Sequence, residues 1–561
     1  MKRQLKSLYI SLLVAVVILP LQRFSGALSL RRHPRVTTLA TMSKETNCDL
    51  AGMEKRRQLH AVVEQDGKGM TGVSTSTFLL LSGIVLPIWA TVFLPLTIFY
   101  QLAKHGFQRL EQLFLRKQDR PQYCKLDSGY RVDEKAVIPR SQRKYDIVLL
   151  GSTGFTGYLM CRHLIRSYGK KDVKWAIAGR NQARLDQLKK RLAEDLDAPR
   201  ALELDTIIVD TSIAETLPSL VKDTRAVVTT AGPFSLYGSP VVEFCCKWGT
   251  HYADITGETS WVQNMMTLWQ ETAQRTGAKV IHFCGNDCVP WDLTVFKAKE
   301  KIEQEGEEGE QLESISILDE VIGDISGGTV HTMQLGMSGR LPPSPTQDPF
   351  QLNAQGMHMK TPTMTNKLSW MISKCTLPWN GRSAYTSPFV MAAVNFQVLG
   401  WSQALSGSGT PLAYSESQVS PDFKSAFVNY MGLIVLFTCM LNPFTGYLLH
   451  QFILPRPGEG PPLEKMESEN FSAIYAQGKG TKGTTVESMI YFPRDCGYYE
   501  TARMVVECGL CMALEEDRLP TAGKHGGGFF SPAYGLGNIL LHRLTKTGTY
   551  FNSFSEKPRK M

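Results

Sequence analysis

The sequence predicts an α/β protein whose central element is a doubly wound parallel sheet over residues 145–290. Two observations carry this prediction. Apolar runs of strand length alternate with stretches whose apolar residues recur at helical spacing, which is the pattern of repeated βαβ units. A glycine-rich turn directly follows the first run, and an open parallel sheet binds its ligand at such a turn.

The first βαβ unit begins with the apolar run at residues 145–150, and its turn has glycines at 151, 154 and 157. The first glycine permits a tight turn, the second lets the backbone approach a pyrophosphate, and the third lets the following helix pack closely on the strand. Free N–H groups at the start of that helix would hold the pyrophosphate. The residues predicted to bind a dinucleotide here are Gly151, Ser152, Thr153, Gly154, Phe155, Thr156 and Gly157.

Arg180 is the residue that selects the cofactor, because it lies just beyond the second apolar run at residues 173–178. NAD-specific sites place an acid at the end of this strand to bind the ribose hydroxyls. A cation pairs instead with the 2′-phosphate of NADP. The sequence therefore predicts a Rossmann domain that binds NADP(H), with Asn181 beside Arg180 and Asp210 near the adenine.

The fourth apolar run, residues 226–231, ends at the place where the nicotinamide ribose is expected, because ligands bind at the carboxyl ends of parallel strands. Ala231, Gly232 and Pro233 complete the predicted cofactor contacts. Hydride transfer also needs a proton donor, but no catalytic signature stands out. The candidates near the expected carboxyl ends are Tyr237, His251, Asp254, Glu258 and Asp287, and no metal site is predicted.

Residues 1–45 have the features of a targeting leader. The first 60 residues carry a net charge of +8 out of +9, and an apolar run at 8–21 follows Lys2, Arg3 and Lys6. This order is typical of a signal peptide or signal anchor, and the Arg-rich stretch behind it is typical of a transit peptide. The chain after residue 60 is nearly neutral, so it lacks the excess of basic residues that is typical of nucleic-acid binding.

Two further apolar segments predict membrane contact. Residues 78–100 contain no charge and are long enough to cross a hydrocarbon core of ~30 Å, so they are predicted to form a transmembrane helix between linkers at 46–77 and 101–144. Residues 430–454 form two apolar halves separated by Asn442 and Pro443, each too short to span. They predict a hairpin in one leaflet or an interfacial helix pair, with a hairpin in a domain core as the alternative.

Eight ordered blocks resemble saccharopine dehydrogenase-like oxidoreductases, and the resemblance covers about residues 145–550. The blocks are residues 151–157, 178–181, 231–238, 249–258, 284–292, 326–329, 455–461 and 526–532. The resemblance implies a second α/β domain on a mixed or antiparallel sheet at 291–520, and a C-terminal segment, 521–561, packed back on the Rossmann domain. The lipid-associated branch, which includes trans-acting enoyl reductases, looks the most similar. One departure is Asn286, where the family turn usually has an aromatic residue.

The predicted function is therefore a membrane-associated, NADPH-dependent oxidoreductase that reduces a lipid-like substrate in glycolipid or lipid metabolism. Two alternatives stay open: a catalytically silent Rossmann-shell protein of lipid droplets or membranes, and a saccharopine-type amino-acid dehydrogenase. The expected partners are the substrate and a membrane or lipid-droplet surface, without nucleic acid, and a homodimer is left open. The sequence does not separate lipid droplet, mitochondrion, endoplasmic reticulum and plastid.

Overall fold

The computed structural model describes residues 50–114, 127–132, 137–286, 288–337, 341–353, 356–357, 364–366, 371–407, 410–456, 458–522 and 526–558. The predicted leader at 1–45 and the candidate Asp287 lie outside these residues. The chain forms two compact units. Unit 1 comprises residues 1–120, 369–388 and 417–456, and unit 2 comprises 121–368, 389–416 and 457–561.

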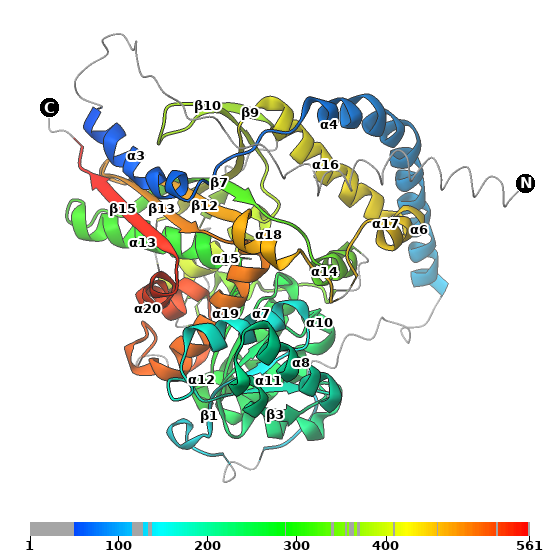
Figure 1. Cartoon of the computed structure of the whole chain (residues 1–561), viewed down its shortest axis with the longest axis vertical. Coiled ribbons are helices and arrows are strands. Elements are labelled where there is room, and N and C mark those ends of the chain that lie inside the picture. Colours follow the sequence, from blue (N-terminus) through cyan, green and yellow to red (C-terminus); the bar gives the residue numbers. More distant parts are fainter. Residues whose placement is uncertain are drawn as a thin grey trace, which may run out of the picture. The chain divides into compact units, whose positions relative to one another are not determined.

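Unit 2 contains the predicted doubly wound sheet, with all of its strands parallel (Figure 1). Its strand order is β14-β6-β5-β4-β1-β2-β3. The strands are β1 (Tyr145–Leu150), β2 (Trp175–Gly179), β3 (Asp205–Ile208), β4 (Thr224–Thr229), β5 (His251–Asp254), β6 (Lys279–Ile281) and β14 (Gly528–Phe530). The central strands are continuous apolar runs because both of their faces are covered.

Helices cover both faces of this sheet. On one face α7 (Phe155–Ser167) packs against α8 (Gln182–Asp195) and α19 (Thr501–Leu514), and α19 contacts β1, β4 and β5. On the other face α11 (Ser239–Trp248) packs against α9 (Pro218–Val221) and α12 (Thr259–Thr276). The Rossmann prediction is confirmed.

The second sheet of unit 2 is mixed and has the order β15-β13-β12-β7-β11, with the short β8 parallel to β11. Its strands are β7 (Leu312–Ile322), β8 (Met364–Asn366), β11 (Leu412–Ser420), β12 (Phe471–Gly480), β13 (Thr485–Phe492) and β15 (Tyr550–Glu556). Helix α13 (Val289–Glu305) packs on this sheet and on α15 (Ala392–Leu405) and α20 (Pro532–Lys546). A second domain on a mixed sheet is therefore also confirmed.

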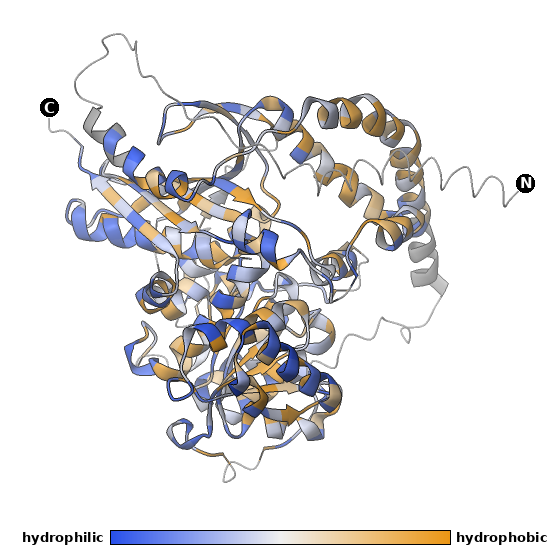
Figure 2. Ribbon diagram, viewed as in Figure 1, coloured by the Kyte–Doolittle hydropathy of each residue, from blue (hydrophilic) through white to orange (hydrophobic). Residues whose placement is uncertain are grey.

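Unit 1 is mainly helical and apolar. A continuous 30-residue helix, Thr75–Lys104, includes α4 (Thr75–Leu80), α5 (Leu86–Ile88) and the start of α6 (Leu94–Phe114), joined by two π-helical turns. It packs on α16 (Phe423–Leu441), which bends at Asn442 into α17 (Pro443–Phe452). Helix α3 (Leu50–Gln65) and the hairpin of β9 (Ser373–Thr376) and β10 (Ser383–Ser387) complete the unit. Figure 2 shows the orange, apolar character of these helices.

The structure differs from the predicted boundaries in three places. The second apolar helix begins at Phe423 rather than 430 and has 19 residues, so it is not too short to span a bilayer by length. Helix α19, assigned by sequence to the second domain, lies on the parallel sheet. The C-terminal segment contributes to both sheets, because β14 pairs with β6 and β15 pairs with β13.

Candidate functional site

The glycine-rich turn has the close contacts that its spacing predicts. Gly151 has a φ of +84°, which favours glycine, and an added Cβ would lie 2.9 Å from the backbone N of Ala231. A Cβ on Gly157 would lie 2.1 Å from the carbonyl O of Gly151. Gly154 is the N-cap of α7 and offers no side chain, so the N–H groups of the first helical turn are available to an anion.

Polar groups without partners border the same turn. The Oγ of Ser152 and the Oγ1 of Thr230 are buried and have no hydrogen-bond partner among the residues that the structure describes. Buried hydroxyls of this kind are costly unless another group binds them. Their placement at the ends of β1 and β4 fits a polar ligand held at the carboxyl edge of the sheet.

Arg180 and Asp210 lie at the ribose end of the predicted site. Arg180 is exposed immediately after β2. Hydrogen bonds from Ser212 lower the pKa of Asp210, and the charge of Arg180 lowers it further, so the two predicted residues are neighbours. Asn181 has a structural role, because its Oδ1 accepts a hydrogen bond from the Arg184 N–H at 3.0 Å and caps α8.

Glu258 fixes the loop after β4. Its carboxylate accepts hydrogen bonds from the N–H groups of Phe234 (2.7 Å) and Ser235 (3.0 Å), at the start of α10 (Phe234–Tyr237). Burial raises the pKa of Glu258, and these hydrogen bonds oppose that change. The contacts hold the predicted cofactor residues Ala231, Gly232 and Pro233 from one side.

Asp254 and His282 form a buried pair at the ends of β5 and β6. The two Asp254 oxygens accept hydrogen bonds from Tyr252 Oη (2.8 Å) and the Thr256 N–H (3.1 Å), and His282 Nδ1 lies 2.8 Å from Oδ2. The Nε2 of His282 is buried without a hydrogen-bond partner in the described part of the chain. Sequence reasoning missed His282; its position directly after the β6 run was the available signal.

His251 does not lie where the sequence placed it. It is the first residue of β5, so it lies at the amino end of a parallel strand, opposite the carboxyl edge where cofactor is expected. Its Nδ1 accepts a hydrogen bond from the Lys279 N–H at 3.0 Å, and its Nε2 lies 3.3 Å from Glu516. Burial lowers its pKa to about 4. Of the other candidates, Tyr237 is exposed at the end of α10.

Residues from the second half of the chain contact the glycine-rich turn. The rings of Phe155 and Tyr498 meet edge to face at 5.5 Å, and a Cβ on Gly460 would lie 2.4 Å from the Phe155 ring. Tyr498 Oη accepts a hydrogen bond from the Ser326 N–H at 2.5 Å and lies 2.8 Å from Thr329 Oγ1. The blocks at 326–329 and 455–461 therefore assemble around the predicted cofactor turn.

Asn286, the departure from the family pattern, is held by the segment that leads into α19. Its N–H donates to Thr501 Oγ1 (2.9 Å), and its Oδ1 accepts a hydrogen bond from the Cys496 thiol (2.8 Å). The amide side chain therefore has a structural partner in place of an apolar contact.

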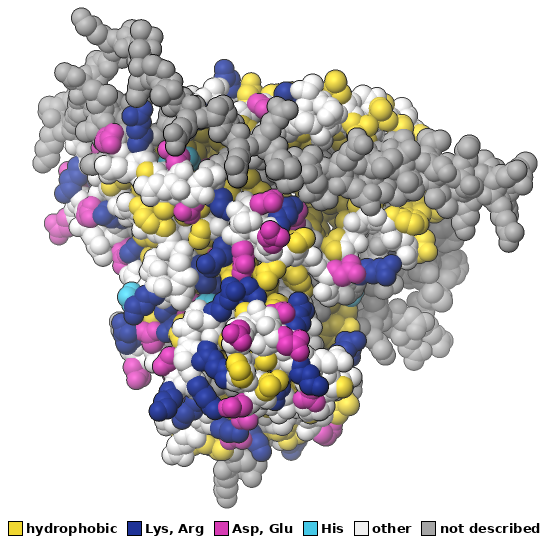
Figure 3. Space-filling model, viewed as in Figure 1, with side chains coloured by type: hydrophobic (Ala, Val, Ile, Leu, Met, Phe, Trp, Pro, Cys, Tyr) yellow, Lys and Arg dark blue, Asp and Glu magenta, His cyan; other side chains and the backbone are white. Residues whose placement is uncertain are grey.

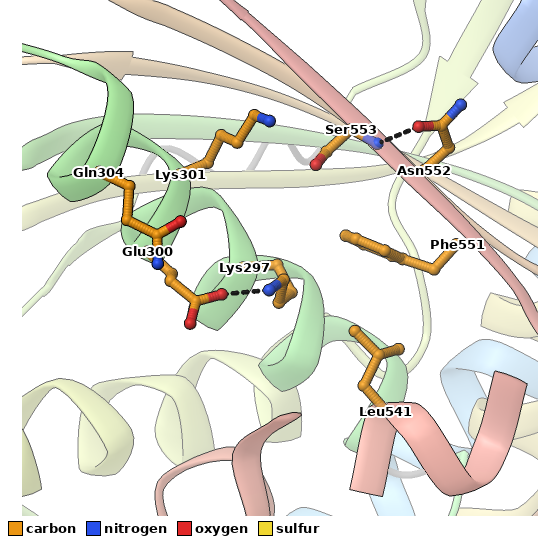
Figure 4. Close-up of a pocket in the computed structure, with 8 residues that line it drawn as sticks. All are labelled: Lys297, Glu300, Lys301, Gln304, Leu541, Phe551, Asn552 and Ser553. Carbon is orange, nitrogen blue, oxygen red and sulfur yellow. Dashed lines mark hydrogen bonds and ion pairs between the residues drawn. The ribbon is translucent and has the colours of Figure 1, made fainter. Parts of the chain in front are cut away.

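A pocket of about 280 Å³ lies elsewhere in unit 2, between α13, α20 and β15 (Figure 4). Lys297 and Glu300 form an ion pair at its floor, and Ser553 and Phe551 of β15 face them. None of its lining residues comes from the carboxyl edge of the parallel sheet, so it is separate from the site above.

Comparisons with known proteins agree with this geometry. Residues 147–281 match the family "Saccharopine dehydrogenase NADP binding domain". A Mycobacterium tuberculosis protein named a putative trans-acting enoyl reductase is 30% identical over 420 residues, covering 72% of this chain and 96% of the relative. A trans-acting enoyl reductase of Mycobacterium ulcerans is 29% identical over 424 residues, covering 73% and 97%.

Among solved structures, the apo saccharopine dehydrogenase (L-Glu forming) of Saccharomyces cerevisiae aligns with a TM-score of 0.42 at 12% identity, over 73% of this chain and 99% of that chain. The family match covers the strands that form the glycine-rich turn and the Arg180 site. The relatives extend that match through the second domain. The chain belongs to the saccharopine dehydrogenase-like family of NADP-dependent oxidoreductases, together with the trans-acting enoyl reductases.

Proposed function

We propose that this protein is a membrane-associated reductase that uses NADPH to saturate the double bond of an enoyl-type lipid substrate. The observation that carries the proposal is the glycine-rich turn, which is closely packed on both sides and open at the helix N-terminus. Two relatives that the chain covers almost end to end are named for enoyl reduction. NADPH, when bound, would supply the hydride, and a proton from water would complete the saturation of the double bond.

The chain's own residues bind and orient the cofactor. The N–H groups at the start of α7 hold the pyrophosphate, and Arg180 pairs with the 2′-phosphate. Glu258 and the Asp254–His282 pair fix the loops at the ends of β4, β5 and β6, where the nicotinamide would lie. These buried carboxylates act by positioning, because their oxygens are occupied by hydrogen bonds within the chain.

Turnover tests the reaction. Full-length protein, purified in detergent, is mixed with NADPH and either a long-chain trans-2-enoyl thioester or, in the reverse direction with NADP⁺, saccharopine. We expect loss of NADPH absorbance with the enoyl thioester only. NADP⁺ reduction with saccharopine, without enoyl turnover, would overturn the lipid substrate while leaving cofactor binding intact.

Membrane association is the second part of the proposal. The helix Thr75–Lys104 and α16 are long and apolar enough to cross a bilayer, and only 11% and 22% of their most apolar windows are buried within the protein. Washing cell membranes with alkaline carbonate tests whether these helices insert: we expect the protein in the pellet, and recovery in the wash would refute insertion. Organelle fractionation then identifies the membrane.

A further inference from the structure

We propose that the helices of unit 1 insert into a single leaflet of a phospholipid surface, with both ends of the helix Thr75–Lys104 on the same side. This replaces the transmembrane helix predicted from the sequence. The inference rests on the proposed membrane association and is independent of the reductase activity.

Large apolar side chains are exposed along both apolar segments of unit 1. Phe99 is 73% exposed and Leu102 is 67% exposed, values that are costly in water. Others on these segments are Leu79, Ile84, Leu96, Phe423, Phe444 and Tyr447. Figure 3 shows hydrophobic side chains over α4. A contiguous apolar surface of this kind marks a binding site.

Four hydroxyls of these helices donate to backbone carbonyls of the same two apolar segments, which lowers the cost of placing them in hydrocarbon. The hydroxyls of Ser82 and Thr91 donate to the carbonyls of Phe78 and Pro87 one turn earlier. The hydroxyl of Thr438 donates in the same way to the carbonyl of Ile434, and the hydroxyl of Thr445 in α17 donates across the bend to the carbonyl of Cys439 in α16. Cations at the edges, including Lys104 and Lys424, suit the phosphate groups of lipid headgroups. Lipid is therefore the occupant that fits both the surface and its edges.

The two helices run side by side in the same direction. At their beginnings the Val73 N–H donates to Ser425 Oγ (2.9 Å) and Lys424 Nζ donates to Thr75 Oγ1 (3.3 Å). At their ends Gln101 Nε2 donates to the carbonyl of Leu441 (2.7 Å). The beginning of the first helix therefore lies on the same side of the lipid surface as the beginning of α16.

The connection from β11 to α16 determines on which side of the lipid surface the helix Thr75–Lys104 begins. Glu416 belongs to unit 2, where it accepts a hydrogen bond from Asn395 (2.8 Å), and the next four residues continue β11. Ser420 still pairs with Tyr385 of β10, so this strand is outside the hydrocarbon. The four residues from Ser420 to Lys424 reach at most about 14 Å, less than half of a ~30 Å core. The beginning of the helix is on the side of unit 2.

The other end of the helix returns to the same unit. Ser128 donates from its N–H and its Oγ to the carboxylate of Glu243 in α11, within unit 2. Residues 105–127 carry eight charged side chains, and each would cost about 2.5–3.5 kcal/mol at the centre of a bilayer. A return crossing by a sequence of this composition would carry all of these charges into hydrocarbon, and we therefore infer that the helix does not cross.

The test compares two lipid probes with the full-length protein: phosphatidylcholine–phosphatidylserine vesicles, and triolein droplets coated with a monolayer of the same phospholipids. We expect flotation with both, because insertion into one leaflet does not need a bilayer. Binding to vesicles alone would overturn the inference and leave membrane association standing. Binding to neither would refute membrane association itself.

A double substitution distinguishes lipid binding by the helices of unit 1 from lipid binding by the apolar run at residues 8–21. Phe99→Glu combined with Leu102→Glu should weaken binding to both probes by about tenfold or more, because two exposed apolar anchors become charged. The control is Leu202→Glu, at a half-exposed leucine of unit 2, which should leave binding unchanged. Unchanged flotation of the double variant, with NADPH binding retained, would overturn the inference.

Discussion

Replacing Gly157 by alanine is expected to weaken NADPH binding without unfolding the protein. The added Cβ would lie 2.1 Å from the carbonyl O of Gly151, 2.6 Å from Ser152 Cα and 2.8 Å from the Gly151 carbonyl C. All three are backbone atoms, so α7 and the turn must separate by about 1 Å to restore ordinary contact. Overpacking of this kind costs about 1–3 kcal/mol.

The strain is expected to lower the affinity for NADPH, because the cofactor binds the turn in its undistorted position. At 1.4 kcal/mol per tenfold, we expect the dissociation constant for NADPH to rise by about 5- to 150-fold. Fluorescence titration of the full-length protein measures it, with thermal unfolding as the check on folding. Gly432→Ala is the matched control, since its Cβ meets nothing within 4 Å. Wild-type affinity in a folded Gly157→Ala variant would refute the reasoning.

Three other substitutions test separate features. Arg180→Ser should raise the dissociation constant for NADPH by about 5- to 30-fold and leave that for NADH unchanged, because an exposed charged contact to phosphate contributes about 1–2 kcal/mol. Arg191→Ser, at an exposed arginine within α8, is the control, and equal losses for both cofactors would contradict the assignment. Asp254→Asn should lower the free energy of unfolding by about 2–4 kcal/mol in urea titration, since it leaves buried donors unpaired. A loss below about 1 kcal/mol would contradict the role of Asp254 in pairing these donors. Burial raises the pKa of Glu416 to about 7, beside Asp319 whose pKa burial also raises. The stability that Glu416 retains while protonated is therefore lost as pH rises from about 4.5 to 7, by up to about 1.4 kcal/mol per pH unit. Glu416→Gln should flatten this loss in denaturation curves between about pH 4.5 and 7, and an unchanged slope would point to other groups.

The parallel sheet and its cofactor turn could be predicted because their signals are local. A strand, three glycines and a helix occupy consecutive residues, and Arg180 follows the next strand. His251 was misplaced for the same reason: the local pattern identified a strand, but the end of the strand decides the side of the sheet. Parallel strands place their first residues at the edge opposite the ligand.

The residues that sequence reasoning missed depend on contacts between distant parts of the chain. Tyr498 contacts Phe155 across more than three hundred residues, and Gly460 packs on the same ring. Gly509 of α19 lies so close to the sheet that a Cβ would be 2.3 Å from a Val228 methyl group. No periodicity in the sequence predicts such long-range contacts. The side of the lipid surface on which we infer that the helix Thr75–Lys104 begins was likewise not predictable from local sequence, because it follows from the contacts of that helix with the start of α16.

Helix α19 and strand β14 lie near the C-terminal end of the sequence, and this has a consequence for biosynthesis. Residues 145–281 supply six of the seven strands of the nucleotide-binding sheet, yet its edge strand and one covering helix come from residues 501–530. During translation the first half therefore emerges with an unpaired strand edge at β6 and uncovered apolar residues on β4 and β5. Such surfaces invite aggregation. The nascent chain must stay protected until almost its last residues leave the ribosome, and a C-terminal truncation would abolish cofactor binding from a distance.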